Sequence, residues 1–175
     1  MTGGIRWSAA VLAGLCWVFL TRLGTDLISG HGLTLQLIAP PLVVSALYLP
    51  YRAGAVTLGL VALLYDAASG APFGITASIA LPAHLLLFRI RRQLTPVNPL
   101  TGAGLALAVA PALHLGFVGG LAIGAREMPS DTIGLLLETG LVAVVSALAT
   151  PWLTGLTLSA LDLFGITLDR GGYRE

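Results

Sequence analysis

Long apolar runs without a charged residue dominate this chain of 175 residues. Hydrophobic residues make up 56% of the sequence and charged residues only 10%, whereas a soluble domain usually carries about 25% charged residues. So few charges could not cover the surface of a soluble protein of this size, and disordered chains are polar rather than apolar. The sequence therefore predicts an integral membrane protein with a single domain over residues 1–175.

The candidate spans follow from the runs between charges, because a helix needs about 20 apolar residues to cross the hydrocarbon core. The runs are residues 7–21, 27–51, 53–65, 67–88, 93–125 and 139–161. They predict an all-α fold, a bundle of six transmembrane helices. A five-helix alternative stays open, because run 27–51 contains Pro40 and Pro41 and run 53–65 is short, so these two could form a re-entrant hairpin.

The distribution of arginines predicts the orientation, since loops rich in basic residues face the cytoplasm. Six helices place seven arginines on one side of the membrane and two, Arg22 and Arg126, on the other. The seven are Arg6, Arg52, Arg89, Arg91, Arg92, Arg170 and Arg174. We therefore expect both termini to be cytoplasmic and the cluster Arg89, Arg91 and Arg92 to be the strongest determinant of topology.

Few residues could carry chemistry. The single cysteine, Cys16, excludes an internal disulfide and a cysteine metal cluster. His84 and His114 have no second ligand three or four residues away, so we expect neutral, hydrogen-bonded helix contacts rather than metal ligands. The sequence contains no hydrolase, metalloprotease or phosphate-loop motif, although a Ser–His or Asp–His pair formed by the fold stays open.

The same observations predict a protein that is not an enzyme and that holds no metal or cofactor. The net charge is only +1, and no basic patch could neutralise a run of phosphates, so we also expect no binding to nucleic acid. Two carboxylates deserve a place among the candidates, because ionisable groups inside a membrane are costly unless paired or wet. Asp66 is expected at the outer end of the third helix and Glu138 near the outer start of the sixth.

The most informative local motif covers residues 59–74, where a helix end, a turn and a helix start follow one another. Gly70 can take the positive φ of a tight turn, and Pro72 suits the first turn of the fourth helix. The Asp66 carboxylate is placed to accept backbone N–H groups at that helix N-terminus, where the dipole favours an anion. The motif predicts a rigid outer hairpin, closed by Gly74, that a partner could recognise.

Small residues recur at four-residue spacing on two predicted helices. Ala9 and Ala13 lie on the first, and Gly102, Ala106 and Ala110 lie on the fifth. Such faces let helices approach closely in lipid. Ordinary packing within the bundle and a docking face for another membrane protein are both compatible with this pattern.

The segment 33–95 resembles the MreD family, small polytopic membrane proteins of the bacterial rod-shape system. The matching residues are Asp66, Gly70, Pro72 and Gly74, followed by the arginine cluster, while Pro41 stands where the family usually has an acid and Thr150-Pro151 resembles its late proline. The resemblance implies a scaffold in the inner membrane. Such a scaffold would bind an MreC-like single-span protein and other elongation-complex proteins, and would help couple the cytoskeleton to peptidoglycan synthesis.

A second resemblance is at the level of the fold. The MreD fold is similar to that of the S-components of energy-coupling-factor vitamin transporters, whose first helix docks on a coupling subunit through an alanine-rich face. Ala9 and Ala13 would fit that face, and an outward pocket near His31, Asp66 and Arg126 would hold the vitamin. The expected outer loops are short and lack the aromatic and polar cluster that usually fixes a small ligand.

The arginine cluster gives a first testable prediction. Replacing Arg89, Arg91 and Arg92 together should disturb the topology, because it removes three of the seven positive charges that favour the cytoplasmic side. A topology reporter fused after Pro99 measures the change. An unaltered reporter signal would mean that other determinants dominate.

Overall fold

The computed structural model describes residues 3–28, 36–69, 72–93, 99–125 and 132–163. All regular structure in these ranges is helical, which confirms the all-α prediction. The elements are α1 (Gly3–Ile28), α2 (Ala39–Tyr48), α3 (Tyr51–Ser69), α4 (Ile75–Ile90), the short 3₁₀ helix η2 (Arg91–Gln93), α5 (Pro99–Ala125) and α6 (Thr132–Leu163).

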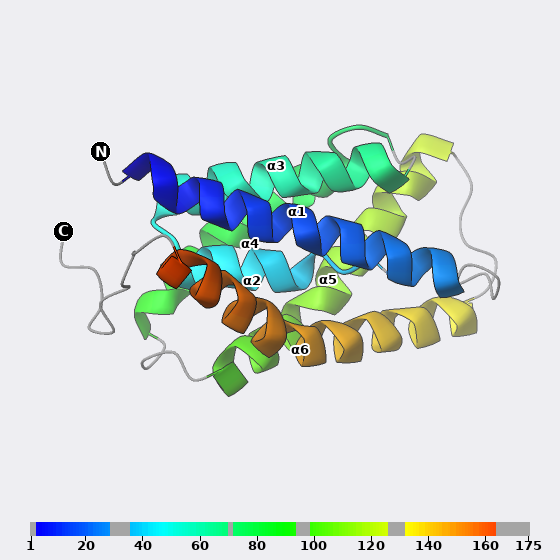
Figure 1. Cartoon of the computed structure of the whole chain (residues 1–175). Coiled ribbons are helices and arrows are strands. Elements are labelled where there is room, and N and C mark those ends of the chain that lie inside the picture. Colours follow the sequence, from blue (N-terminus) through cyan, green and yellow to red (C-terminus); the bar gives the residue numbers. More distant parts are fainter. Residues whose placement is uncertain (1–2, 29–35, 70–71, 94–98, 126–131, 164–175) are drawn as a thin grey trace.

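The helices run up and down one bundle (Figure 1). The helices α1, α3 and α5 run in one direction, and α6 returns in the other. The start of α4 lies beside the end of α5, since Ile75 is the neighbour of Gly120 and Ile79 that of Gly116. One end of the bundle therefore holds the α3–α4 turn, and we name it the Asp66 end. The other holds the start of α1, the end of α6 and η2, and we name it the Arg91 end.

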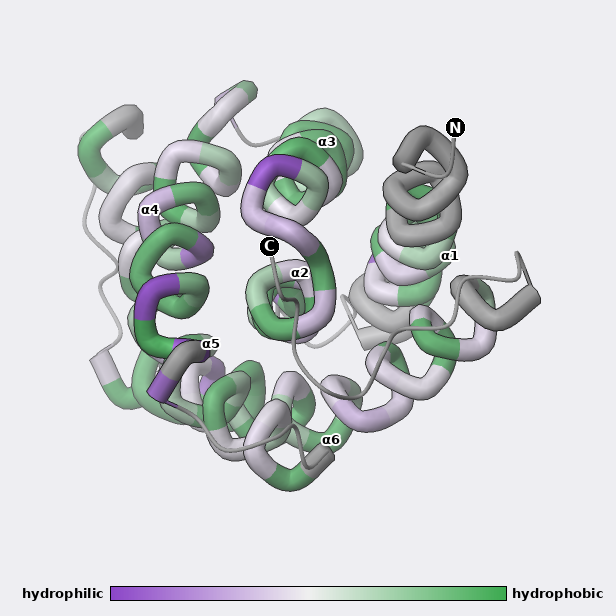
Figure 2. The backbone as a smooth tube through the Cα atoms, turned by 90° about the vertical axis from the view of Figure 1, so that its left-hand side faces the viewer, coloured by the Kyte–Doolittle hydropathy of each residue, from purple (hydrophilic) through white to green (hydrophobic). Residues whose placement is uncertain are grey.

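The short helix α2 occupies the middle of the bundle (Figure 2). It contacts all five other α-helices, and every residue from Ala39 to Ala46 is buried. A helix that is apolar all round belongs in a core, and the sequence of α2, APPLVVSALY, has this character. The hydrophobic core is accordingly built around Leu42 and Val43, which have no exposed surface.

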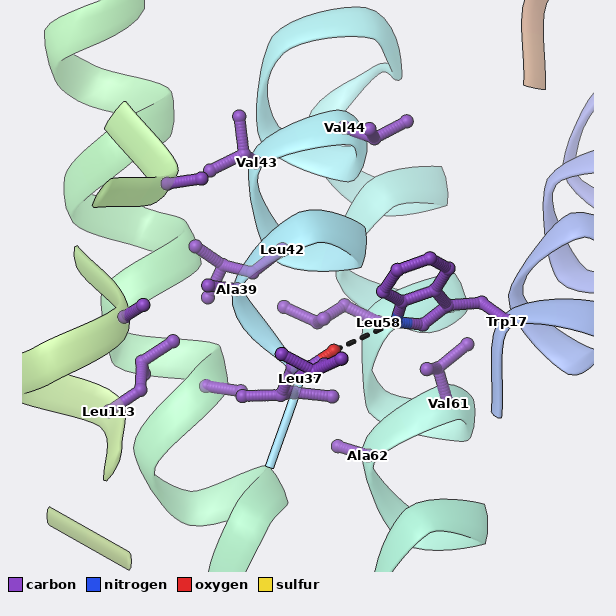
Figure 3. Packing of buried hydrophobic residues seen from close by; sticks show 14 of the residues in the cluster. Trp17, Leu37, Ala39, Leu42, Val43, Val44, Leu58, Val61, Ala62 and Leu113 are labelled. Atoms are coloured by element: carbon purple, nitrogen blue, oxygen red, sulfur yellow. Dashed lines mark hydrogen bonds between the residues drawn. The ribbon is translucent and has the colours of Figure 1, made fainter. Parts of the chain in front are cut away.

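The start of α2 is buried, and the first N–H groups of a helix have no hydrogen-bond acceptor within the helix. Buried N–H groups without an acceptor cost free energy, and the sequence at the start of α2 avoids part of this cost. Pro40 and Pro41 occupy the first turn, and proline has no N–H to satisfy. The preceding segment 36–38 is not helical. Its Leu37 carbonyl accepts a hydrogen bond from Trp17 Nε1 of α1 over 2.7 Å (Figure 3).

This arrangement corrects the expectation for run 27–51. Its helix has only 10 residues, about 15 Å at 1.5 Å per residue, half of what a span requires. Apolar composition could not reveal this, because a buried half-helix and a lipid-facing span have the same hydropathy. The sixth helix is longer than the charge-free run 139–161 from which it was predicted. It begins at Thr132, so Glu138 lies well inside α6 and not at its start.

By length and composition, two helical segments of the described chain suffice to cross a membrane. They are Leu100–Ile123 in α5 and Thr132–Ala160 in α6. The apolar stretches Val11–Leu23, Ala39–Tyr48 and Ile75–Ile90 are shorter.

Three helices approach one another closely at Gly54 of α3. A Cβ atom at this position would lie 2.7 Å from the Ser45 carbonyl oxygen of α2 and 2.8 Å from His84 Nε2 of α4. Both distances are shorter than any ordinary carbon contact. Gly54 is therefore the residue that allows α2, α3 and α4 to meet.

We expect Gly54→Ala to destabilise the bundle by about 1 to 3 kcal/mol or more, the usual cost of overpacking a core. The clash involves backbone at Ser45, which cannot rotate away. Thermal unfolding in detergent measures the effect. Gly59→Ala is the matched control on the same helix, because its nearest neighbour would be Leu81 Cδ2 at 3.9 Å. Equal melting temperatures for the two variants would contradict the close approach.

Candidate functional site

The Asp66 carboxylate ties the end of α3 to the start of α4. Asp66 Oδ2 accepts hydrogen bonds from the Gly74 N–H over 2.9 Å and from the Thr76 N–H over 3.2 Å, and Oδ1 lies 3.1 Å from the same Thr76 nitrogen. These donors are among the N–H groups that an α-helix leaves without a partner in its first turn. The prediction that Asp66 accepts backbone N–H groups at the fourth helix is confirmed.

The local sequence explains why a remote side chain performs this cap. The residue at the N-cap of α4 is Gly74, which has no side chain to serve as a cap. Its φ of 96° is a left-handed conformation that glycine adopts without steric cost. The expectation that Pro72 stands in the first turn of the helix is wrong, because α4 begins at Ile75. Gly70, expected to take a positive φ, lies outside the described residues.

The turn presents an aromatic side chain to its surroundings. Phe73 is 72% exposed, whereas Asp66 is 0% exposed. A partner at this end would therefore meet Phe73 and Pro72, which is also exposed. The carboxylate beneath them determines the shape of the turn. From the sequence we singled out Asp66, Pro72 and Gly74 but missed Phe73, although a large apolar residue within a turn of small residues is a recognisable signal.

Thr76 extends the polar contacts of the turn toward α2. Its hydroxyl accepts a hydrogen bond from Gln36 Nε2 over 3.5 Å, and both side chains are buried. Gln36 lies in the non-helical segment 36–38 that leads into α2. The conformation of the α3–α4 turn and the start of the central helix are thus linked through Thr76.

The Arg91 end contains a second cap, of opposite charge. Arg91 Nη1 donates hydrogen bonds to the Ala46 and Leu49 carbonyl oxygens, over 3.1 and 2.9 Å. Its guanidinium carbon lies 3.9 Å from the centre of the Phe88 ring, within the range of a cation–π contact. Arg91, expected only as a topology determinant, therefore also closes the C-terminal end of α2. Arg89 is exposed, and the side chain of Arg92 lies outside the described residues.

Both histidines of the described helices are buried, each about 1% exposed. Both ring nitrogens of His114 lack a hydrogen-bond partner among the described residues, so the expectation of a hydrogen-bonded contact is wrong for His114. His84 packs against the rings of Tyr51 and Phe88, which also contact each other. His114 Nε2 lies 4.0 Å from Glu138 Oε2, which places an ionisable pair between α5 and α6.

The small-residue faces pack within the chain where the structure describes them. Ala13 is buried, and a Cβ atom on Gly14 would meet Val61 Cγ2 of α3. On α5, Ala106 and Ala110 are buried, and Gly102 faces Thr150 of α6. The side chain of Ala9 is not described, and His31 and Arg126 lie outside the described residues.

Nothing in the described part of the chain assembles a metal site, since no three His, Cys, Asp or Glu side chains come together there. Comparison of the chain with known protein families, with curated proteins and with solved structures finds no match. The geometry of the α3–α4 turn, which we name the capped turn (residues 66–76), is thus the feature on which a functional argument can rest.

The cap predicts the behaviour of Asp66 variants. Asp66→Ala should lower the free energy of unfolding by about 2 kcal/mol or more, because it leaves N–H groups of α4 without an acceptor. The Thr76 amide should also exchange its hydrogen faster, which hydrogen–deuterium exchange measures. Asp66→Asn, which keeps one acceptor oxygen, should give a smaller change.

Ser69→Ala provides the control in the same turn. The Ser69 hydroxyl donates to the Asp66 main-chain carbonyl, over 3.2 Å, and this bond is separate from those between the Asp66 carboxylate and α4, so its loss should leave the Thr76 amide protected. Equal protection of Thr76 in wild-type protein and in Asp66→Ala would contradict the role of the carboxylate.

Proposed function

We propose that the chain is a six-helix inner-membrane scaffold of the bacterial cell-wall elongation machinery, with both termini in the cytoplasm. In this role it binds an MreC-like single-span protein and takes no part in chemistry. The observation that carries the proposal is the capped turn, where the Asp66 carboxylate binds the start of α4 and Phe73 is exposed at the end of the bundle opposite the arginine cluster.

The surface of the bundle supports a membrane location. Large apolar side chains are exposed on several helices, whereas a soluble monomer rarely exposes extended apolar surface. They include Leu12, Phe19, Leu86, Leu107, Leu148 and Trp152. In the proposed arrangement α1, α3, α4, α5 and α6 meet lipid, and α2 crosses only part of the membrane inside their ring.

The distribution of charge supports the proposed orientation. Arg52 starts α3 and Arg89 ends α4, so both lie at the Arg91 end and both are exposed. Basic residues prefer the cytoplasmic side, which would place the Arg91 end in the cytoplasm. The capped turn would then face the outside of the cell, where the soluble part of an MreC-like partner resides.

The competing proposal is a substrate-binding subunit of a vitamin transporter, and one feature favours the scaffold. In transporters, the free N–H groups at the start of a broken helix bind anionic substrate groups, but Pro40 and Pro41 remove such donors at the start of α2.

The proposal predicts that Phe73→Ala weakens partner binding while the protein still inserts and folds. Exposed aromatic residues that become buried at an interface often contribute enough for a roughly tenfold loss on truncation. The measurement is an affinity pull-down from native membranes in mild detergent, with quantification of each co-purifying protein. Recovery of a single-span protein with a periplasmic domain, reduced about tenfold by Phe73→Ala, is the expected result.

Phe19→Ala is the matched control, because Phe19 is also an exposed phenylalanine, at 67%, but lies on α1. It should leave recovery of the partner unchanged. Equal recovery with Phe73→Ala would remove the capped turn from the interface. Recovery of a membrane coupling subunit with ATPases would instead support the transporter.

A further inference from the structure

A small cavity, partly open at the surface of the bundle, lies where α1, α2, α3 and α6 meet, independent of the capped turn. Its volume is about 20 Å³, and its wall includes Gly14, Leu58 and Leu153. Three hydroxyl side chains from three different helices also line it, namely Ser45, Thr57 and Thr157. Each of these three side chains is at least nine-tenths buried.

Thr57 is the unusual member of this set. Thr21, Thr139, Thr150, Thr154 and Thr157 each donate a hydrogen bond to a carbonyl of their own helix. Thr57 Oγ1 has no such bond and no other hydrogen-bond partner among the described residues. Burying a hydroxyl without a hydrogen-bond partner costs free energy. A ligand in the cavity that Thr57 lines would remove this cost by forming a hydrogen bond with the hydroxyl.

The other two hydroxyls complement Thr57. Ser45 Oγ donates to the Leu42 carbonyl oxygen over 3.0 Å, and Thr157 Oγ1 donates to the Leu153 carbonyl oxygen over 2.8 Å. Their protons are thus committed, but a hydroxyl oxygen also has two acceptor lone pairs. The cavity therefore offers one uncommitted donor and two uncommitted acceptors.

We propose that this cavity binds a single water molecule that joins α2, α3 and α6. The water accepts a hydrogen bond from the Thr57 hydroxyl and donates to the oxygens of Ser45 and Thr157. The volume decides the number, because one buried water needs about 10 to 15 Å³ of such space and two to four polar partners. A cavity of this size has room for one water and excludes a lipid tail or an organic ligand.

The sign of the stability change in Thr57→Val tests the proposal, since valine has nearly the same shape but no hydroxyl. If the water is bound, the variant loses a bridged network, and its melting temperature should fall by about 2 to 4 °C, the shift that one hydrogen bond produces in a chain of this length. If the cavity is dry, the variant loses only an unpartnered polar group, and the melting temperature should rise.

A direct observation decides between these outcomes even if the variant folds poorly. An experimental structure of the wild-type chain at high resolution should show one ordered solvent peak within hydrogen-bond distance of Thr57 Oγ1, Ser45 Oγ and Thr157 Oγ1. Thr154→Val is the matched control, because Thr154 is buried on the same face of α6 but is not in the cavity wall, and it should keep this peak. Absence of the peak in the wild-type structure, or a higher melting temperature for Thr57→Val, would overturn the proposal.

Discussion

A ten-residue helix buried on every side dictates much of this structure, because its backbone ends must be satisfied without bulk water. At its start, prolines remove N–H groups that would otherwise lack a partner. Just before it, Trp17 of α1 binds the Leu37 carbonyl. At its end, Arg91 binds two carbonyl oxygens. These solutions come from α2 itself, from α1 and from η2, so the position of the central helix also fixes the helices that surround it.

The two charged caps follow the same electrostatic rule at opposite ends of the bundle. The carboxylate of Asp66 meets the N-terminus of α4, and the guanidinium of Arg91 meets the C-terminal carbonyls of α2. Each charge therefore has the sign that the local helix dipole favours. Placing a charge of this kind in apolar surroundings is costly unless it is hydrogen-bonded, and both are. Asp66 and Arg91 therefore stabilise helix ends, a role that their positions in the sequence only partly predict.

The sequence was sufficient to predict helices throughout, because long apolar runs without charges are typical of helices that are buried or in lipid. It also predicted the cap made by Asp66, because an acid followed by a glycine- and proline-rich turn and an apolar run is typical of a carboxylate at a helix N-terminus. Hydropathy could not show that α2, with 10 residues, is less than half as long as its apolar run 27–51, since burial in protein and burial in lipid favour the same residues. Nor could it separate Arg91 from Arg89, because only the three-dimensional path from α4 into η2 brings Arg91 to the end of α2. The sequence also could not predict that the Thr57 hydroxyl lacks a hydrogen-bond partner among the described residues. A threonine within a helix looks the same in sequence whether or not its hydroxyl binds a carbonyl of its own helix.

The central position of α2 has a consequence for biosynthesis. A ribosome releases helices in chain order, so α2 emerges when, of the described helices that cover it, only α1 has been made. The other described neighbours follow, and α6 is the last of them. The core around α2 can therefore close only after α6 has been synthesised, and until then a helix destined for the interior keeps part of its apolar surface uncovered.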